Sequence, residues 1–178
     1  ELDLDKKDIW TKSDTQLYQM YMVGVLYTEY PPLRNDYSNM DIITEANFKK
    51  LKKKENNFLV IVSRNKKYFS LSSYKTDKKF GDKIIEIDSK LNTIINKWLA
   101  HNTTGFFLVN AKNSQMSDNS LTKLLNKIFE SSKKKISSTL IRHVYLSEKY
   151  ENTQAQMEAD ADTMGHSVST QQNIYVKK

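Results

Sequence analysis

Cysteine is absent from this chain of 178 residues. A disulfide framework and a thiolate metal site are therefore excluded, and the composition fits an intracellular protein. The sequence also lacks an apolar run of the roughly 18 residues that a membrane-spanning helix needs, and no signal peptide opens it. We therefore expect no membrane partner.

Arginine is scarce, although the chain is basic. The net charge is +7, and of 28 basic residues only three are arginines, namely Arg34, Arg64 and Arg142. A basic balance favours polyanionic partners, nucleic acid first, but a solvated lysine-rich surface explains it equally well. The planar donor fork of arginine matches phosphate oxygens in a way that lysine cannot. An arginine retained in such a chain is thus a candidate for phosphate contact.

The residues that are present describe one globular domain. The hydrophobic fraction is 38% and the aromatic fraction 11%, which suffices for a core. No repeat, low-complexity tract or linker divides the chain. Because the first residue is Glu1 rather than Met, we expect the chain to be a piece of a longer protein.

The hydrophobic pattern predicts a mixed α+β fold. Helices are expected over residues 13–30, 89–102, 117–132, 139–151 and 153–165, the last of them ended by Gly165. Three strands, separated by short turns that favour an antiparallel meander, are expected over residues 58–63, 67–75 and 82–88. Residues 105–110 are expected to be a short extended piece.

The ends and faces of two helices can also be predicted. In the first helix, Ser13 or Asp14 is the expected cap, and the expected apolar face consists of Leu17, Met20, Tyr21 and Val25. Ser89 is the expected cap of the helix over residues 89–102.

Five polar residues stand in an order that favours one chemistry. Arg34 follows a Pro-Pro helix stop, and Lys75 stands where the second strand meets its turn. Arg142 opens "RHVYLSEKY", His166 lies in "MGHS", and Tyr175 follows nine residues later. Each alone has an ordinary structural explanation, such as a surface charge or a buried ring. Their joint order and spacing favour a shared site.

This order resembles the catalytic domain of tyrosine recombinases, the phage-integrase family. In that family an arginine follows the first long helix, a lysine lies on a β-hairpin, and a His-x-x-Arg motif opens a later helix. A Gly-His-Ser turn comes next, and the nucleophilic tyrosine stands nine residues after its histidine. The segments "LIRHVYLS" and "TMGHS" match, and the resemblance spans residues 13–175.

The resemblance implies a fold, a domain and a cofactor state. The expected fold is mainly helical α+β, with a small three-stranded antiparallel sheet. Residues 1–178 would be the single C-terminal catalytic domain, without the N-terminal core-binding domain of the family. No metal or other cofactor is expected, and the active site is expected in a basic groove.

The reaction that the resemblance implies is transesterification at a DNA phosphodiester. Tyr175 would attack the phosphorus, leaving a 3′-phosphotyrosyl link and a free 5′-hydroxyl. Arg34, Arg142 and His166 would stabilise the charge on the non-bridging oxygens. Lys75 would protonate the departing 5′-oxygen.

Four nearby residues qualify the match. Thr139 stands where the family motif has its histidine, and a hydroxyl is no base near neutral pH. His143 points about 100° away from its neighbour Arg142 on a helix, so we expect it to pack or to support the site. Lys78 or Lys79 is an alternative to Lys75, and both are expected to contact DNA.

Other functions stay open. A type IB topoisomerase uses a similar set of residues, and the threonine at 139 suits a relic that binds DNA without cutting it. The acidic residues Glu158, Asp160 and Asp162 fit a magnesium nuclease, although no second carboxylate cluster accompanies them. A lysine-rich scaffold that binds no DNA is the remaining alternative.

The expected partner is double-stranded DNA. By the same resemblance, the full-length protein would form a homotetramer on DNA, and the isolated domain a monomer. Its place would be at intracellular DNA, in the nucleus or viral factory of a eukaryotic host or else in the cytoplasm. The segments "YPPLRNDY" and "YKTDKKFG" resemble integrases of viruses and mobile elements of eukaryotes. The densest basic run, residues 49–57, is expected to be a solvated loop, with DNA backbone contact open to it.

Overall fold

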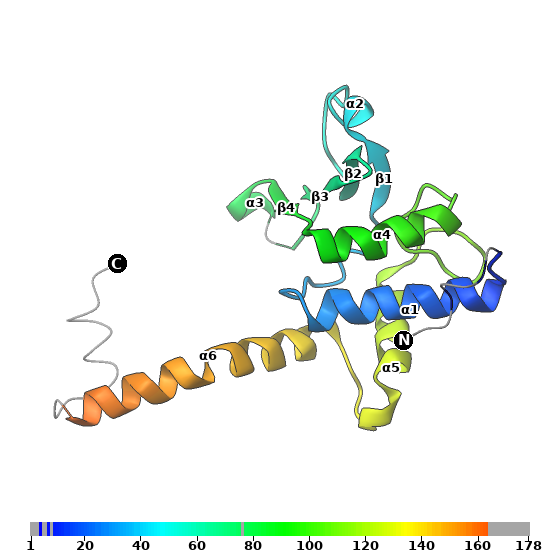
Figure 1. Cartoon of the computed structure of the whole chain (residues 1–178). Coiled ribbons are helices and arrows are strands. Elements are labelled where there is room, and N and C mark those ends of the chain that lie inside the picture. The colour runs from blue at the N-terminus through cyan, green and yellow to red at the C-terminus, as the bar shows by residue number, and fades with distance from the viewer. Residues whose placement is uncertain (1–3, 5–6, 8, 76, 164–178) are drawn as a thin grey trace.

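The computed structural model describes residues 4, 7, 9–75 and 77–163. These residues form a mixed α+β domain (Figure 1). The helices are α1 (Lys12–Thr28), α2 (Glu45–Phe48), α3 (Asp77–Phe80), α4 (Ser89–His101), α5 (Asp118–Ile128) and α6 (Ser138–Thr163), with a 3₁₀ turn at Glu130–Ser132. The strands are β1 (Asp41–Thr44), β2 (Phe58–Ser63), β3 (Lys66–Leu71) and β4 (Lys83–Glu86).

The sheet has four strands in the order β1-β2-β3-β4. The predicted antiparallel meander is confirmed in β2, β3 and β4, but the prediction of three strands is wrong. β1 pairs in parallel with β2, beginning with Asp41 opposite Phe58. A parallel pair needs a crossover connection, which α2 and the residues after it supply. β1 was missed because four residues are too few for a clear alternation.

The two faces of the sheet pack into different hydrophobic clusters. Leu59 and Phe69 face the main core, which also contains residues of α1 and α4. Phe58 and Val60 face the opposite side, where they pack with Phe48 of α2. Successive strand residues point to opposite faces, so the crossover and the main core cover the same strands from two sides.

A buried lysine joins the sheet to α4. The Lys67 side chain is only 3% exposed. Its Nζ donates to the Arg64 carbonyl at 2.8 Å and to the side-chain oxygens of Asn92 and Asn96 at 2.8 and 2.6 Å. Burial lowers the pKa of this ammonium, and the charge of Arg64 lowers it further. The network fixes α4 on the β2–β3 turn, where Arg64 is exposed.

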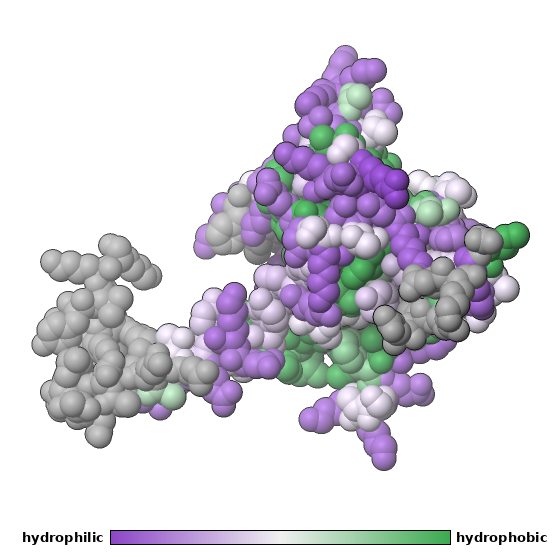
Figure 2. Space-filling view, viewed as in Figure 1, coloured by the Kyte–Doolittle hydropathy of each residue, from purple (hydrophilic) through white to green (hydrophobic). Residues whose placement is uncertain are grey.

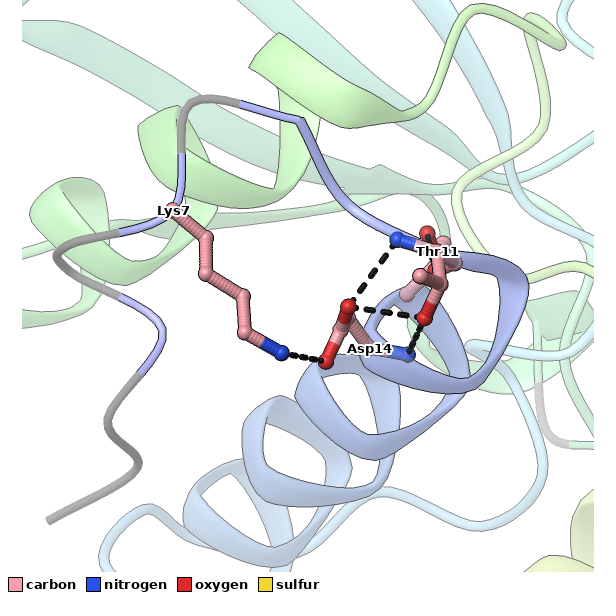
Figure 3. A network of polar contacts seen from close by, with 4 residues as sticks. Lys7, Thr11 and Asp14 are labelled. Carbon is pink, nitrogen blue, oxygen red and sulfur yellow. Dashed lines mark hydrogen bonds and ion pairs between the residues drawn. The ribbon is translucent and has the colours of Figure 1, made fainter.

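A capping box begins α1 (Figure 3). The Asp14 amide donates to Thr11 Oγ1 at 3.2 Å, and the Thr11 amide donates to Asp14 Oδ2 at 2.9 Å. Lys7 Nζ donates to the other Asp14 oxygen at 2.8 Å. This bond and those from Thr11 lower the pKa of Asp14 to about 2. The predicted caps are wrong: Thr11 is the cap, and Asp14 is its reciprocal partner at the third helical position.

The buried face of α1 also differs from the prediction. Val25 is buried as predicted, but Leu17 and Tyr21 are 44% and 43% exposed. Met22, Val23 and Leu26, which lie outside the predicted face, are fully buried. Apolar residues occur on every side of this helix, so their spacing alone did not fix which side faces the core.

The remaining elements follow the sequence more closely. α5 begins after its cap Ser117 and buries Leu121 and Leu125. α4 spans almost the predicted residues, but Asp88 caps it in place of Ser89. Residues 105–110 form no strand; Phe106 makes an isolated bridge to Asp41.

α6 is one continuous helix of 26 residues, so the prediction of two helices over 139–151 and 153–165 is wrong. No proline or glycine interrupts these residues before Gly165, which lies outside the described residues. The helix begins beside α1 and then projects away from the body (Figure 1). None of the described helices is long and apolar enough to cross a membrane.

Candidate active site

A hollow of about 460 Å³ opens where four segments meet. These segments are the turn after α1, the loop between β3 and α3, and the first residues of α5 and α6. The lining residues are Arg34, Asn35, Asp36, Asn39, Ser73, Tyr74, Lys75, Asp77, Asp118, Ser138 and Thr139. The hollow thus brings together Arg34, Lys75 and Thr139, which are far apart in the sequence.

Arg34 lies in a tight turn that α1 holds in place. The Tyr27 hydroxyl donates to the Arg34 carbonyl at 2.5 Å. Tyr27 is fully buried, and burial raises its pKa, so the phenol stays protonated and remains a donor. The amide of Ser38 donates to the Asn35 carbonyl at 2.9 Å and closes the turn. The Arg34 side chain is half-buried at the wall of the hollow.

Asp36 occupies the same turn and lies within the fields of two arginines. Burial raises the pKa of its carboxyl group, while a hydrogen bond from the Arg34 backbone and the charges of Arg34 and Arg142 lower it. The Asp118 carboxylate raises it again. Because the net direction is upward, burial outweighs the two arginines. Sequence reasoning missed Asp36, although it stands two residues after the arginine that was singled out.

Asn57 ties this turn to the loop that carries Lys75. Its side chain, 1% exposed, donates to the carbonyls of Asp36 at 3.2 Å and Ser73 at 2.9 Å. Its carbonyl oxygen accepts from the amides of Ser72 and Ser73 at 3.1 and 3.0 Å. One buried amide therefore fixes two walls of the hollow. A polar residue directly before an apolar strand was the only sequence signal for it.

The loop around Lys75 differs from the prediction. The expected strand over residues 67–75 ends at Leu71, because the next two amides bond to Asn57 instead of a neighbouring strand. Lys75 is exposed four residues beyond that end. Lys78 and Lys79 are exposed on α3, the short helix that follows.

The first two turns of α6 supply the other wall. Ser138 is buried, and Thr139 is exposed at the hollow. Arg142, half-buried, stands three residues later on the same side of the helix, close enough to Asp36 to lower its pKa. His143 is exposed and makes no hydrogen bond or ion pair with the described part of the chain. It therefore does not pack in the core.

The charge of the hollow is mixed. The hollow is lined by two basic residues, Arg34 and Lys75, and by three acidic residues, Asp36, Asp77 and Asp118. Asp118 already accepts a hydrogen bond, because Ser38 Oγ donates to its Oδ1 at 2.5 Å. The expectation of a basic groove is therefore wrong for the described residues, which carry both signs at this place.

Two of the predicted residues, His166 and Tyr175, lie outside the described residues. Of the alternative magnesium ligands, Glu158 is exposed, and the side chains of Asp160 and Asp162 also lie outside what the structure describes. Within the described residues, no three histidine, aspartate or glutamate side chains gather as a metal site.

A larger hollow, about 670 Å³, lies between α1, α5 and the residues after α4. Trp98 and Met116 contribute apolar surface to it, and Lys12, Lys123 and Lys127 line it as well. None of the predicted site residues lines this hollow, so it has no part in the predicted chemistry.

No protein-family model, curated protein or solved structure shows a significant similarity to this chain. Function must therefore be argued from the residues and from their arrangement.

Proposed function

We propose that this chain is the catalytic domain of a tyrosine recombinase that cleaves and rejoins double-stranded DNA through a 3′-phosphotyrosyl intermediate. The main support is that Arg34, Lys75 and Thr139 line one hollow, and that Arg142 lies close enough to Asp36 of that hollow to lower its pKa. The motif "TMGHS" and the tyrosine nine residues after its histidine add sequence support.

The proposed roles follow from the chemistry of each side chain. Arg34 and Arg142 bind the non-bridging oxygens of the phosphate, and His166 donates a further hydrogen bond to it. Tyr175 attacks the phosphorus, and Lys75 gives a proton to the departing 5′-oxygen. The phosphotyrosyl ester conserves the energy of the broken bond, so the strand can be rejoined to a new partner.

Asp36 has a supporting role in this proposal. In this proposal the Asp36 carboxylate attracts the guanidinium groups of both arginines through their charges, since no direct ion pair joins them among the described residues. This proposal also explains why the hollow contains acidic residues. Their carboxylates attract the basic side chains before DNA binds, and the phosphate of the incoming DNA then replaces part of this attraction.

Thr139 favours a second candidate, a relic that binds DNA without cutting it. The hydroxyl can hold a hydrogen bond but does not accept the proton of the attacking phenol. A type IB topoisomerase-like activity is the other alternative, and relaxation of a supercoiled plasmid by a monomer would distinguish it. For the full-length protein we propose a tetramer on intracellular DNA, and for this domain alone a monomer.

The deciding experiment is a suicide-substrate assay in EDTA with nicked duplex DNA that carries the terminal sequence of the element. We expect the wild-type chain to form a covalent protein–DNA adduct and Tyr175→Phe to form none, because phenylalanine has no nucleophilic oxygen. DNA binding without any adduct from the wild type would favour the relic. An adduct that persists in Tyr175→Phe would refute the proposed nucleophile.

A further inference from the structure

The crossover from β1 to β2, residues 45–57, is strongly basic. It contains five lysines and two glutamates, a net charge of +3, and all five lysines are exposed. With α2 it forms a lobe that stands out from the body (Figure 1), and the surface of that lobe is largely hydrophilic (Figure 2).

Part of this charge is compensated within the lobe. Lys49 pairs with Glu45 at 3.0 Å, and Lys53 pairs with Glu55. Among the described residues, no acidic group pairs with Lys50 or Lys52. The lobe therefore presents three cations that pair with no acid among the described residues, Lys50, Lys52 and Lys54. Lys54 lies over the Phe48 ring, which leaves Lys50 and Lys52 as the two free cations.

The lobe is anchored, which a merely solvated loop would not require. The Phe48 side chain is 5% exposed, and its ring lies 5.7 Å from that of Phe58 and 6.1 Å from that of Tyr68. Lys54 Nζ lies over the Phe48 ring, 4.6 Å from its centre. Backbone bonds from Lys50 to Asn47 and from Leu51 to Phe48 continue the turn after α2.

The crossover also ends at the candidate site. Its last residue is Asn57, whose side chain bonds to the backbones of Asp36 and Ser73 at the walls of the hollow. Lys52 and Lys50 are five and seven residues away from Asn57, spans of at most about 18 and 25 Å. Phosphates of one DNA strand recur about every 3.4 Å along the duplex axis, so flanking phosphates come within reach of the lobe.

We propose that this lobe is a second DNA-contact surface, in which Lys50 and Lys52 bind backbone phosphates that flank the phosphate held in the hollow. The inference rests on the proposed function, because it takes the hollow as the place of the cleaved phosphate. It replaces the expectation of a solvated loop with an anchored element that sets the path of the duplex.

The test compares two double variants of the full 178-residue chain. Lys50→Gln/Lys52→Gln removes the two free cations of the lobe. Lys12→Gln/Lys112→Gln removes the same charge from exposed positions at the start of α1 and after α4, away from the candidate site, and is the matched control. Affinity for a 24-base-pair duplex is measured by fluorescence anisotropy from 50 to 200 mM KCl.

Each phosphate contact contributes about 0.9 to the slope of log affinity against log salt concentration. We expect the lobe variant to lose about 1.8 from the wild-type slope, so salt weakens its binding about tenfold less over this range. The control is expected to keep the wild-type slope. Equal losses in both variants, or no loss in the lobe variant, would overturn the inference.

The two proposals can fail separately. A wild-type chain that binds with the expected slopes but forms no adduct removes the proposed catalysis and leaves the lobe as a DNA contact. An adduct that depends on Tyr175, with unchanged slopes in the lobe variant, removes only the lobe. A wild-type chain that binds no duplex removes both.

Discussion

Asp36 occupies a position where ionisation of its carboxyl group lowers the stability of the folded protein. Burial raises the pKa of its carboxyl group above the unfolded value of about 3.9, so the folded protein binds that proton more tightly than the unfolded chain. Stability therefore falls as pH rises from the unfolded pKa through the higher folded pKa. Above the folded pKa the ionised carboxylate destabilises the fold, which is the pattern of a residue retained for function.

The variant Asp36→Asn tests this directly. We expect its Tm to exceed that of the wild type at pH 7 and to equal it near pH 3, where the carboxyl group is neutral in both states. Adduct formation is expected to fall at pH 7, because the arginines lose the carboxylate that orients them. Thermal melts across this pH range provide the measurement, with the exposed Asp82→Asn as control. A lower Tm at pH 7 would mean that the arginines outweigh burial.

At the scale of elements, the sequence predicts best where one pattern dominates. The apolar run in residues 58–63 gave β2 to the residue, and the stripe of Leu121 and Leu125 gave the start of α5, which ends four residues before the predicted end. Residues 12–28 are apolar on every side, so the helix was predicted and its buried face was not. Parallel pairing of β1 depends on residues 45–57 folding back across the sheet, which no local pattern reports.

The candidate site was predictable in part for a related reason. The order and spacing of Arg34, Lys75 and Arg142 marked them as candidates, and tertiary structure brings their segments to one hollow. Asp36 and Asn57 act through burial and through bonds to the backbone of distant segments. Such roles leave no mark in the sequence beyond a polar residue in an unremarkable place.

Asn57 joins three segments, so we expect removal of its side chain to lower the free energy of unfolding of the domain. Asn57→Ala leaves two partly buried amides and two carbonyls without their partner. We expect a loss of about 2–3 kcal/mol in the free energy of unfolding, measured by urea denaturation.

The neighbouring variant Asn56→Ala is the control for this prediction. Asn56 is exposed and makes one bond, to Asp41 Oδ2 at 3.1 Å, so a loss below about 1 kcal/mol is expected. Equal losses in the two variants would contradict the role of Asn57 as the link between the walls of the hollow.

At the scale of the whole molecule, α6 divides into a docked part and a free part. Its first two turns border the hollow, whereas the rest runs clear of the body (Figure 1). A segment that packs on no other element in the described part of the chain can melt without lowering the stability of the body. The stability of the domain should therefore be insensitive to the far half of this helix.

A proline at position 151 tests this division. Glu151→Pro removes one helical hydrogen bond and is expected to reduce the helical circular dichroism while leaving the Tm of the body unchanged. We also expect it to speed adduct formation, because a broken helix lets the following chain turn back. Lys123→Pro in α5, which packs on α1, is the matched control and should lower the Tm. A large drop in Tm for Glu151→Pro would show that α6 is docked along its length.

The length of α6 also limits when the proposed chemistry can occur. From Thr139 to Thr163 the helix rises about 36 Å at 1.5 Å per residue. Twelve residues separate Thr163 from Tyr175, and fully stretched they span about 40–43 Å. The tether is thus barely long enough to return the tyrosine to its own hollow, and drawing it taut would cost about 1–2 kcal/mol per residue in entropy. For the proposed reaction, a continuous α6 therefore keeps His166, only three residues beyond Thr163, out of reach of the hollow, so cleavage requires this helix to break first.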